Sequence, residues 1–306
     1  MSKKKPDHGQ SKPAERPTVA DVLGPYLIEQ CTLLLTIGAE LERAFNQERA
    51  QNLPAARIHQ ARVACRKLRS LLGSYGEFFD MAKAGRLSDD TDWFGARLGA
   101  LRDLDVLGER LTAAMADLDD DLVLHAADRE LAEQLRYRRR IALASLRDAL
   151  HLEGYANLLA QLQDWQQQPA WSPAAQKSAT KIKKCVKQAE HRLDRRLRQA
   201  AEAIRADGPE ADDLIHTARK AAKRHRYAVE AAQPALGSSA ERTIASRRRL
   251  QDQLGDYQDS RLAAQLLRDL GGIPGRNGFT FGVLMAQEQD HRRRLRKKIA
   301  TRSAGS

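Results

Sequence analysis

The sequence is poor in several features that would point to particular classes of protein. Only 5% of its 306 residues are aromatic, which weakens any model in which nucleic-acid bases stack on the protein. The three cysteines, Cys31, Cys65 and Cys185, lie far apart and form no CxxC motif, so we expect buried, reduced thiols of a cytosolic protein. No run of 18 apolar residues is present, which argues against a membrane span.

Known catalytic motifs are also missing. The chain contains no GxxxxGK[ST], GxSxG or HExxH pattern, and no cluster of alternating acids that could hold Mg²⁺. We therefore expect a protein that is not an enzyme and that needs neither a cofactor nor a metal ion. A phosphatase is the remaining enzymatic hypothesis, and phosphate release in the presence of Mg²⁺ would support it.

Apolar residues recur with helical spacing through most of the chain, and no period-two alternation bounded by turn residues is found. This pattern predicts an all-α fold of two tandem four-helix bundles. We expect a disordered basic tail at 1–17, a first repeat at 18–167, a linker at 168–176, a second repeat at 177–300 and a tail at 301–306. Ser88 and Asp89 are expected to cap the third helix, and the next helix is expected to run from about 120 to 150.

One stretch of the sequence is written twice. Residues 58–69, IHQARVACRKLR, return as residues 215–226, IHTARKAAKRHR, at a constant offset of 157 positions. Neither copy contains an acid, a glycine or a proline, and both are rich in residues that favour helices. A second pair, Leu98-Gly99 with Asp103 and Leu254-Gly255 with Asp259, repeats in the same order at an offset of 156. The repetition predicts two halves related by pseudo-two-fold symmetry.

Each copy should place a row of cations on one helix face. At about 100° per residue, positions i, i+3, i+7 and i+10 fall within an arc of about 80°. We call each such row a ladder: the first is His59, Arg62, Arg66 and Arg69, and the second is His216, Arg219, Lys223 and Arg226. Like charges on one face destabilise a helix, so their repetition without acids favours an anion-binding surface over a merely solvated face.

Two residue types near the ladders have more than one possible role. His59 and His216 lack partner ligands one turn on, where Arg62 and Arg219 would repel a cation, so a phosphate contact or a structural hydrogen bond is favoured over a metal site. Asp103 and Asp259 could act as general bases, but pairing with a ladder arginine to hold it in place is the favoured role. Glycines within a helix predict close packing of a neighbour against them.

The net charge of +12 is concentrated in the repeated stretch. Residues 57–69 and 215–226 carry five Lys or Arg each and no acid. A surface of this kind attracts polyanions but does not by itself select one. A nucleic-acid backbone therefore remains the alternative ligand, with few aromatics and no recognisable reading module weighing against sequence-specific binding.

These motifs resemble those of the CHAD domain, the conserved-histidine α-helical domain. The resemblance rests on His59-x-x-Arg62 and His216-x-x-Arg219 with the cations that follow them, and on the two Leu-Gly-x-x-x-Asp strings; Gln258 departs from Arg102 of the first copy. It implies basic helices facing a central groove or pore, binding of inorganic polyphosphate, and a cytoplasmic location at polyphosphate granules. No alternating Glu-x-Glu-x-Lys motif of a fused triphosphatase is present, so the resemblance implies a binder without a catalytic domain.

The resemblance also implies which side chains bind the polyanion. The residues expected to line the groove are His59, Arg62, Arg66, Arg69, His216, Arg219, Lys223 and Arg226, with Lys67, Lys220 and Arg224 at its margin. Bidentate arginines and point-charge lysines suit the oxygens of a phosphate chain. The sequence does not predict the preferred chain length, the oligomeric state or a partner protein.

Overall fold

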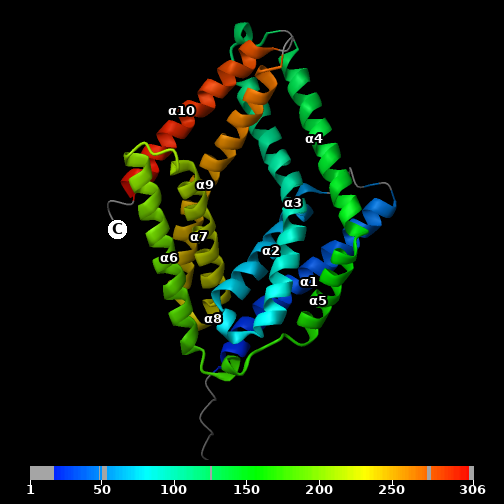
Figure 1. Ribbon diagram of the computed structural model, residues 1–306, viewed down its shortest axis with the longest axis vertical. Helices are drawn as coiled ribbons and strands as arrows, with labels where there is room; N and C mark the ends of the chain where they lie inside the picture. Colours follow the sequence, from blue (N-terminus) through cyan, green and yellow to red (C-terminus); the bar gives the residue numbers. More distant parts are fainter. Residues whose placement is uncertain (1–16, 48, 50–53, 125, 274–276, 303–306) are drawn as a thin grey trace, which may run out of the picture.

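The computed structural model describes residues 17–302, except 48, 50–53, 125 and 274–276 (Figure 1). Within this range it is all-helical, as predicted, and contains no β-strand, only two isolated bridges. The first half contains α1 (Val19–Asn46), α2 (Ala55–Ser74), α3 (Met81–Ala116), α4 (Ala127–Leu150) and α5 (Glu153–Gln167). The second half contains α6 (Thr180–Arg205), α7 (Ala211–Ala231), α8 (Gln233–Leu236), α9 (Ser238–Gly271) and α10 (Gly278–Arg302). Three short 3₁₀ turns are η2 (Gly76–Phe78), η3 (Asp120–Leu122) and η4 (Pro173–Gln176).

Capping side chains explain where several helices begin. Thr18 and Asp21 form a reciprocal capping box at the start of α1. The prediction that Ser88 and Asp89 cap the third helix is wrong, because α3 starts at Met81 and Asp80 accepts a hydrogen bond of 2.8 Å from the backbone of Lys83. An aspartate eight residues before Ser88 thus satisfies one of the free amide groups at the start of the helix.

The next predicted helix is shorter than expected. Residues 120–122 form the separate 3₁₀ turn η3, so α4 begins at Ala127 rather than near residue 120. In the second half, η4 is followed by α6, which begins at Thr180. The predicted tails lie mostly outside the described residues.

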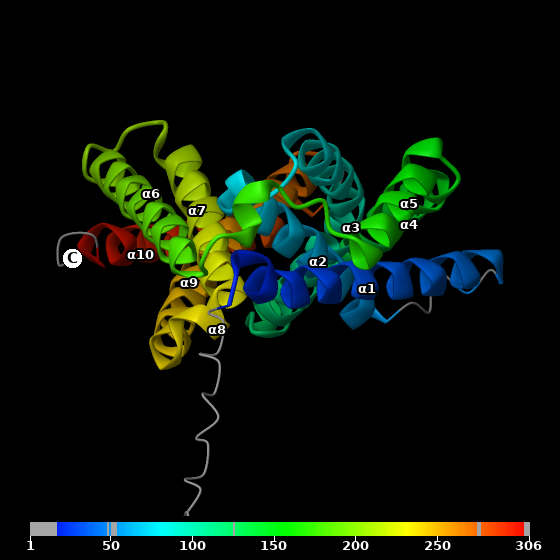
Figure 2. The ribbon, with the colours of Figure 1, turned by 90° about the horizontal axis from the view of Figure 1, so that it is seen from below.

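The helices form a four-sided frame when viewed as in Figure 1. Helices α1, α2 and α5 make one lower side and α6 to α8 the other, while α3 with α4 and α9 with α10 make the upper sides. The view from below separates the α6–α7 arm from the α4–α5 arm and shows α1 running alongside α2 (Figure 2). Among the described residues, the two halves meet mainly where α2 packs against α7 and where α3 packs against α9, and α1 and α2 also contact α6.

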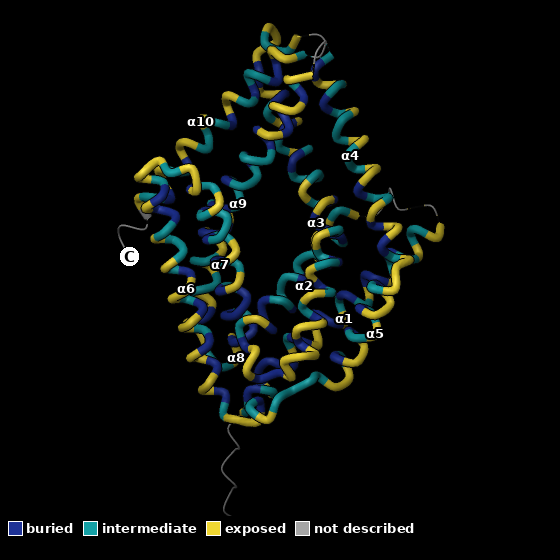
Figure 3. The backbone as a smooth tube through the Cα atoms, in the orientation of Figure 1, coloured by how far each residue is buried: buried dark blue, intermediate teal, exposed yellow. Residues whose placement is uncertain are grey.

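The hydrophobic core is not divided between the halves. There are three buried clusters among the described residues. The largest contains residues of helices α1 through α5, such as Leu68 of α2, together with residues of α6 and α7, such as Ile182 of α6. The second joins α3 and α4 to α9 and α10 through residues such as Leu111 and Phe281, and the third lies within the second half. Buried positions therefore lie where helices pack against one another, and they occur in both halves (Figure 3). The repeat boundaries and the pseudo-symmetry stay predictions.

The expected linker packs against the first half. Trp171 stacks on Phe79 with ring centroids 4.8 Å apart, and the backbone amide of Ser172 donates to the carbonyl of Phe78 at 2.9 Å. This contact anchors the chain where it crosses from α5 to α6. Aromatic stacking of this kind adds to the burial of the two rings.

Among the helices of the described residues, α1 is the single one that is long and apolar enough, by length and composition only, to cross a membrane. Half of its most apolar window is buried against the rest of the protein, as expected for a core helix. Cys31 lies on its buried face. All three cysteines are buried and free, as predicted.

Candidate functional site

The repeated stretches lie side by side because α2 packs against α7. Ser70 donates from its hydroxyl to the carbonyl of Arg224 at 3.0 Å, and the buried Tyr75 donates to the carbonyl of Ala228 at 2.6 Å. Both bonds join a side chain at the C-terminal end of α2, or directly after it, to the backbone of α7. The core faces of the two helices are thereby fixed against each other, and the ladder residues near them are brought within electrostatic reach.

Four cations of the two ladders form the centre of this junction, and we call Arg62, Arg66, Arg219 and Lys223 the central cation cluster. Arg66, Arg219 and Lys223 make no ion pair or hydrogen bond with any residue that the structure describes, and the Nε atoms of Arg66 and Arg219 are buried without a partner. A buried polar atom without a partner costs free energy. The cluster therefore holds donors that a bound anion could satisfy.

The electrostatic cost of the cluster falls mainly on Lys223. Burial, followed by the charges of Arg219 and Arg66, lowers the pKa of Lys223 to about 6. Burial also lowers the pKa of Arg219, and the nearby charges of Arg66 and Arg62 act in the same direction. Because like charges disfavour each other's ionised forms, a negative ligand placed among them would restore the charge of Lys223.

Two arginines of the first ladder are held by acids from α3. Arg62 forms a bidentate ion pair with Asp103, with Nη1 2.8 Å from one carboxylate oxygen, and Arg69 pairs with Asp92. The pairing of Asp103 with a ladder arginine is confirmed. Gly99 leaves room for it, since a methyl group there would lie 3.3 Å from Nε of Arg62.

The equivalent acid in the second half is arranged differently. Asp259 forms no ion pair within the described part of the chain, and burial raises its pKa, with the charge of Asp103 adding to the rise while Arg219 opposes it. Gly255, the counterpart of Gly99, has nothing within 4 Å of the position of a methyl group. Arg219 is therefore less firmly held than Arg62.

A cavity of about 380 Å³ lies between α2 and α3. Its charged lining consists of Arg62, Arg66 and Arg69 from α2 with Asp92 and Asp103 from α3. Small residues of α3, among them glycines 95 and 99, keep it open. The unpaired Arg66 thus stands between two arginines whose guanidinium groups are oriented by acids, which suits recognition of phosphate oxygens. A groove or pore through the whole protein stays a prediction.

The two motif histidines lie at the edge of the cluster. Burial first, and then the charges of Arg102, Arg66 and Arg62, lower the pKa of His59. Burial and the charges of Lys220 and Arg219 lower the pKa of His216, while a hydrogen bond with Gln258 opposes that change. No group of three or more His, Cys, Asp or Glu that could hold a metal ion occurs among the described residues.

Four of the predicted binding residues lie outside the central cation cluster. Lys67 lies over the ring of Tyr26, 5.3 Å from its centroid. Arg226 pairs with Glu230 at 3.4 Å and lies 4.6 Å from the centroid of Tyr227. The structure therefore places these two beside aromatic rings, whereas Lys220 and Arg224 are exposed. Their predicted role in binding is untested.

His225, which lies within the second copy of the repeated stretch, is packed inside the protein. Its side chain is buried, and Nδ1 accepts a hydrogen bond of 3.1 Å from Arg247, which also pairs with Glu190. Burial and the charge of Arg247 lower the pKa of His225 to about 4, so the ring is neutral near pH 7.

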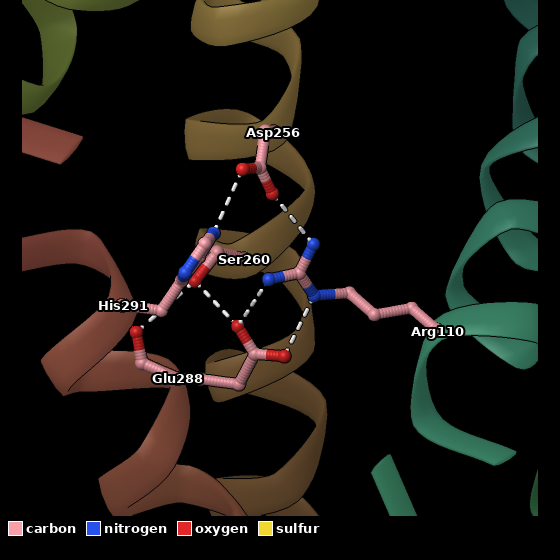
Figure 4. A network of polar contacts seen from close by, with 5 residues as sticks. All are labelled: Arg110, Asp256, Ser260, Glu288 and His291. Carbon is pink, nitrogen blue, oxygen red and sulfur yellow. Dashed lines mark hydrogen bonds and ion pairs between the residues drawn. The ribbon is translucent and has the colours of Figure 1, made fainter. Parts of the chain in front are cut away.

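The second junction between the halves is built from acids and bases together. Arg110 of α3 donates to both carboxylate oxygens of the buried Glu288 of α10, at 2.6 and 2.8 Å, and to Asp256 of α9 at 2.8 Å (Figure 4). Ser260 and His291 complete this group, which we call the Arg110 network. Burial opposes ionisation of Asp256, but its bonds from Arg110 and His291 outweigh burial and lower its pKa. The sequence analysis missed this network because its members are far apart in the chain.

The family model that matches the chain is the CHAD domain, over residues 36–268. Two Mycobacterium tuberculosis proteins of the curated set, the uncharacterized proteins MT2285 and Rv2226, are each 30% identical over 250 residues, which cover 79% of this chain and 46% of theirs. The chain thus spans about half the length of these relatives. It belongs to the CHAD domain family, and the sequence resemblance is confirmed.

Two solved structures share the fold. PptA from Streptomyces chartreusis matches with a TM-score of 0.73 at 20% identity, covering 95% of this chain and 100% of PptA. The CHAD domain of the plant Ricinus communis matches with a TM-score of 0.67 at 23% identity, covering 99% of this chain and 97% of the plant domain. The arrangement of helices in Figure 1 is therefore that of the family.

Proposed function

We propose that this protein binds inorganic polyphosphate through the central cation cluster, without catalysing a reaction. The observation that carries the proposal is the meeting of Arg66, Arg219 and Lys223, from both copies of the repeated motif, without any acid paired to them in the described chain. Membership in the CHAD family supports the proposal, because the sequence resemblance to this family implies polyphosphate binding. Association with polyphosphate granules in the cytoplasm belongs to the same proposal.

Physical chemistry favours a phosphate chain as the ligand. The repulsion within the cluster is already present in the folded protein, so an anion can bind without further ordering of these side chains. Arg62 and Arg69 are oriented by acids and Arg66 lies between them beside the cavity, which gives closely spaced sites for oxygens. A flexible polyanion can satisfy several such sites at once.

A nucleic-acid backbone is the second candidate, because it carries the same charged oxygens. The tyrosines at the junction of α2 and α7 do not favour it: Tyr75 and Tyr227 are at most 2% exposed and offer no face on which a base could stack. Neither ligand requires catalytic groups. Titration with both polymers separates the two candidates.

The test is a binding titration with long-chain polyphosphate, duplex DNA and single-stranded RNA at several salt concentrations. In the double variant Arg66→Ala/Lys223→Ala we expect polyphosphate affinity to fall by at least about 100-fold, since each lost charge-assisted contact is worth about 1.5–3 kcal/mol. The matched control is Arg294→Ala/Lys298→Ala, which removes one arginine and one lysine from the exposed face of α10. It should change affinity by no more than about 3-fold, the weaker effect of distant surface charge.

Two outcomes would count against the proposal. If the three polymers bind equally at matched salt, the protein is a general polyanion binder. If both double variants weaken binding to the same degree, the central cation cluster is not the site. Measurement of phosphate release from polyphosphate with Mg²⁺ tests the absence of catalysis in the same samples.

A further inference from the structure

A second group of arginines lies where α2, α6 and α7 meet. These three helices pack against one another. The guanidinium group of Arg224 lies against α2, because a methyl group at Gly73 would be 3.4 Å from Nη2 of Arg224. The hydroxyl of Ser70 fixes the same region by donating to the carbonyl of Arg224 at 3.0 Å. Arg224 therefore reaches across the junction from α7 to the last turn of α2.

The charges of this group are not neutralised. Arg192 of α6 and Arg224 are both exposed, and neither guanidinium group makes an ion pair or hydrogen bond with a described residue. Arg247 bonds both Glu190 of α6 and His225 of α7, so Arg192 and Arg224, one or two residues from these, lie at the same level of the two adjoining helices. In agreement with this placement, burial of part of the Arg224 guanidinium group, and then the charges of Arg192 and Arg69, lower the pKa of Arg224. Arg69 has one acidic partner, the exposed Asp92.

Arg69 connects this group to the central cation cluster. It lines the cavity between α2 and α3 together with Arg62 and Arg66. From Arg62 to Arg69 the helix rises about 10 Å at 1.5 Å per residue, so the cations follow α2 toward its C-terminal end. There Arg224 continues the row and Arg192 extends it onto α6. We call Arg69, Arg224 and Arg192 the α6 extension.

We infer that a bound polyanion continues from the central cation cluster along the α6 extension, so that the protein prefers long phosphate chains to short ones. This inference rests on the proposed function. It assigns a binding role to Arg192, which lies outside both copies of the repeated motif, and it gives Arg224 a place on the path of the ligand.

The preference for long chains follows from the number of cations that one ligand can reach. A short chain that fills the central cluster has no phosphate left to contact Arg192. A longer chain contacts both groups, and the second contact is intramolecular once the first has formed. By analogy with nucleic acids, each neutralised phosphate also adds to the dependence of affinity on salt.

The test compares tripolyphosphate with polyphosphate of about 100 units or more, in the wild type and in Arg192→Gln/Arg224→Gln. We expect the wild type to bind the long chain more tightly per molecule. The variant should lose about 10-fold in affinity for the long chain, and its salt dependence should be shallower by about 1 to 2 counterions. Its affinity for tripolyphosphate should stay within about 2-fold of the wild type.

Two further variants make the test specific. Lys183→Gln/Lys187→Gln removes two exposed cations from a different face of α6, about 140° to 180° around the helix from Arg192, and should leave both affinities unchanged. Arg192→Lys/Arg224→Lys keeps the charges and should restore most of the long-chain affinity. The single exposed substitution Arg192→Gln, with thermal unfolding measured in parallel, separates a binding effect from a folding defect.

The inference is overturned if Arg192→Gln/Arg224→Gln weakens short and long chains equally, if it weakens neither, or if the Lys183/Lys187 control loses as much. Failure of the proposed function looks different. In that case wild-type protein binds neither phosphate chain, or the Arg66→Ala/Lys223→Ala variant binds tripolyphosphate as well as the wild type.

Discussion

The two junctions that join the halves of this protein treat buried cations in opposite ways. At the junction of α3 with α9 and α10, Arg110 is neutralised by Asp256 and by Glu288, which is 6% exposed. At the junction of α2 with α7, Arg66, Arg219 and Lys223 meet without a paired acid among the described residues. Arginine and lysine alone thus do not identify a binding site; the absence of an acid paired with them does.

The difference separates a structural junction from a candidate binding junction. Satisfied buried charges hold helices in one arrangement, and removing one partner leaves the other charge buried. Unsatisfied charges of one sign destabilise the fold and become favourable when an anion arrives. Substitutions at the two junctions should therefore change stability in opposite directions.

The largest expected effect is at the Arg110 network. Glu288→Ala should destabilise the protein by about 3–5 kcal/mol, because it leaves Arg110 without its bidentate partner at a buried position. Chemical denaturation followed by circular dichroism measures this change. Asp290→Ala is the control, since Asp290 pairs with Arg293 on the exposed face of α10 and should cost less than about 0.5 kcal/mol. Equal effects of the two substitutions would show that the network does not stabilise the junction.

At the other junction the opposite sign is expected. Lys223→Met should raise the melting temperature near pH 7 by a few degrees, because folding makes the Lys223 amine give up most of its proton, a cost that methionine does not have. Between pH 6 and 10.5 the folded protein binds fewer protons at Lys223 than the unfolded chain does, so wild-type stability should rise with pH through this range.

The advantage of Lys223→Met should consequently shrink as the pH approaches 10, which thermal unfolding at pH 7 and pH 9.5 can measure. Lys220→Met is the matched control, since Lys220 is exposed on the same helix. A lower melting temperature for Lys223→Met at both pH values would mean that Lys223 stabilises the fold.

A smaller effect is expected in the pH dependence of polyphosphate binding. The pKa of Lys223 is about 6 in the free protein, and a bound polyanion should raise it, so binding takes up a proton at pH values between the free and bound pKa. Affinity should therefore fall several-fold as the pH rises from 6 to 8.5. Lys223→Arg keeps the positive charge over this range and should flatten the profile. An unchanged slope in that variant would assign the proton uptake to other groups, such as His59 and His216.

The smallest effects should come from the two equivalent glycines. Gly255→Ala should stabilise the protein by up to about 1 kcal/mol, because a methyl group there meets nothing and alanine favours a helix. Gly99→Ala places a methyl group 3.3 Å from Nε of Arg62, so displacement of that side chain from Asp103 should cancel much of the gain. Thermal unfolding of both variants checks the difference. Equal stabilisation would mean that the two halves hold their first arginine alike.

The sequence predicted much of the fold for reasons that are local. Helical spacing of apolar residues gave the all-α class. The sequence analysis was wrong at the start of α3, which Asp80 caps eight residues before Ser88, because spacing alone does not fix the residue at which a helix begins. It also predicted the pairing of Asp103 with a ladder arginine, although the same reasoning did not distinguish Asp259.

The candidate site was predicted only in part. The repeated motif identified Arg62, Arg66, Arg219 and Lys223, because like charges without acids are visible in the sequence. Arg226 occupies an equivalent position to Arg69 but pairs with Glu230, four residues on, a partner that the first copy lacks because Gly73 stands there. Nothing in the sequence indicated a binding role for Arg192, because its neighbours in space come from α2 and α7.

The sequence by itself determined that this chain is helical, that a cationic motif occurs twice, and that the chain resembles the CHAD domain. Those properties depend on spacing and residue type along one chain. The tertiary structure decided which cations remain without a partner, because pairing depends on acids brought close from other helices. Arg110 and Arg66 are both arginines on helices that join the halves, and only packing shows that one is neutralised and the other is free to meet an anion.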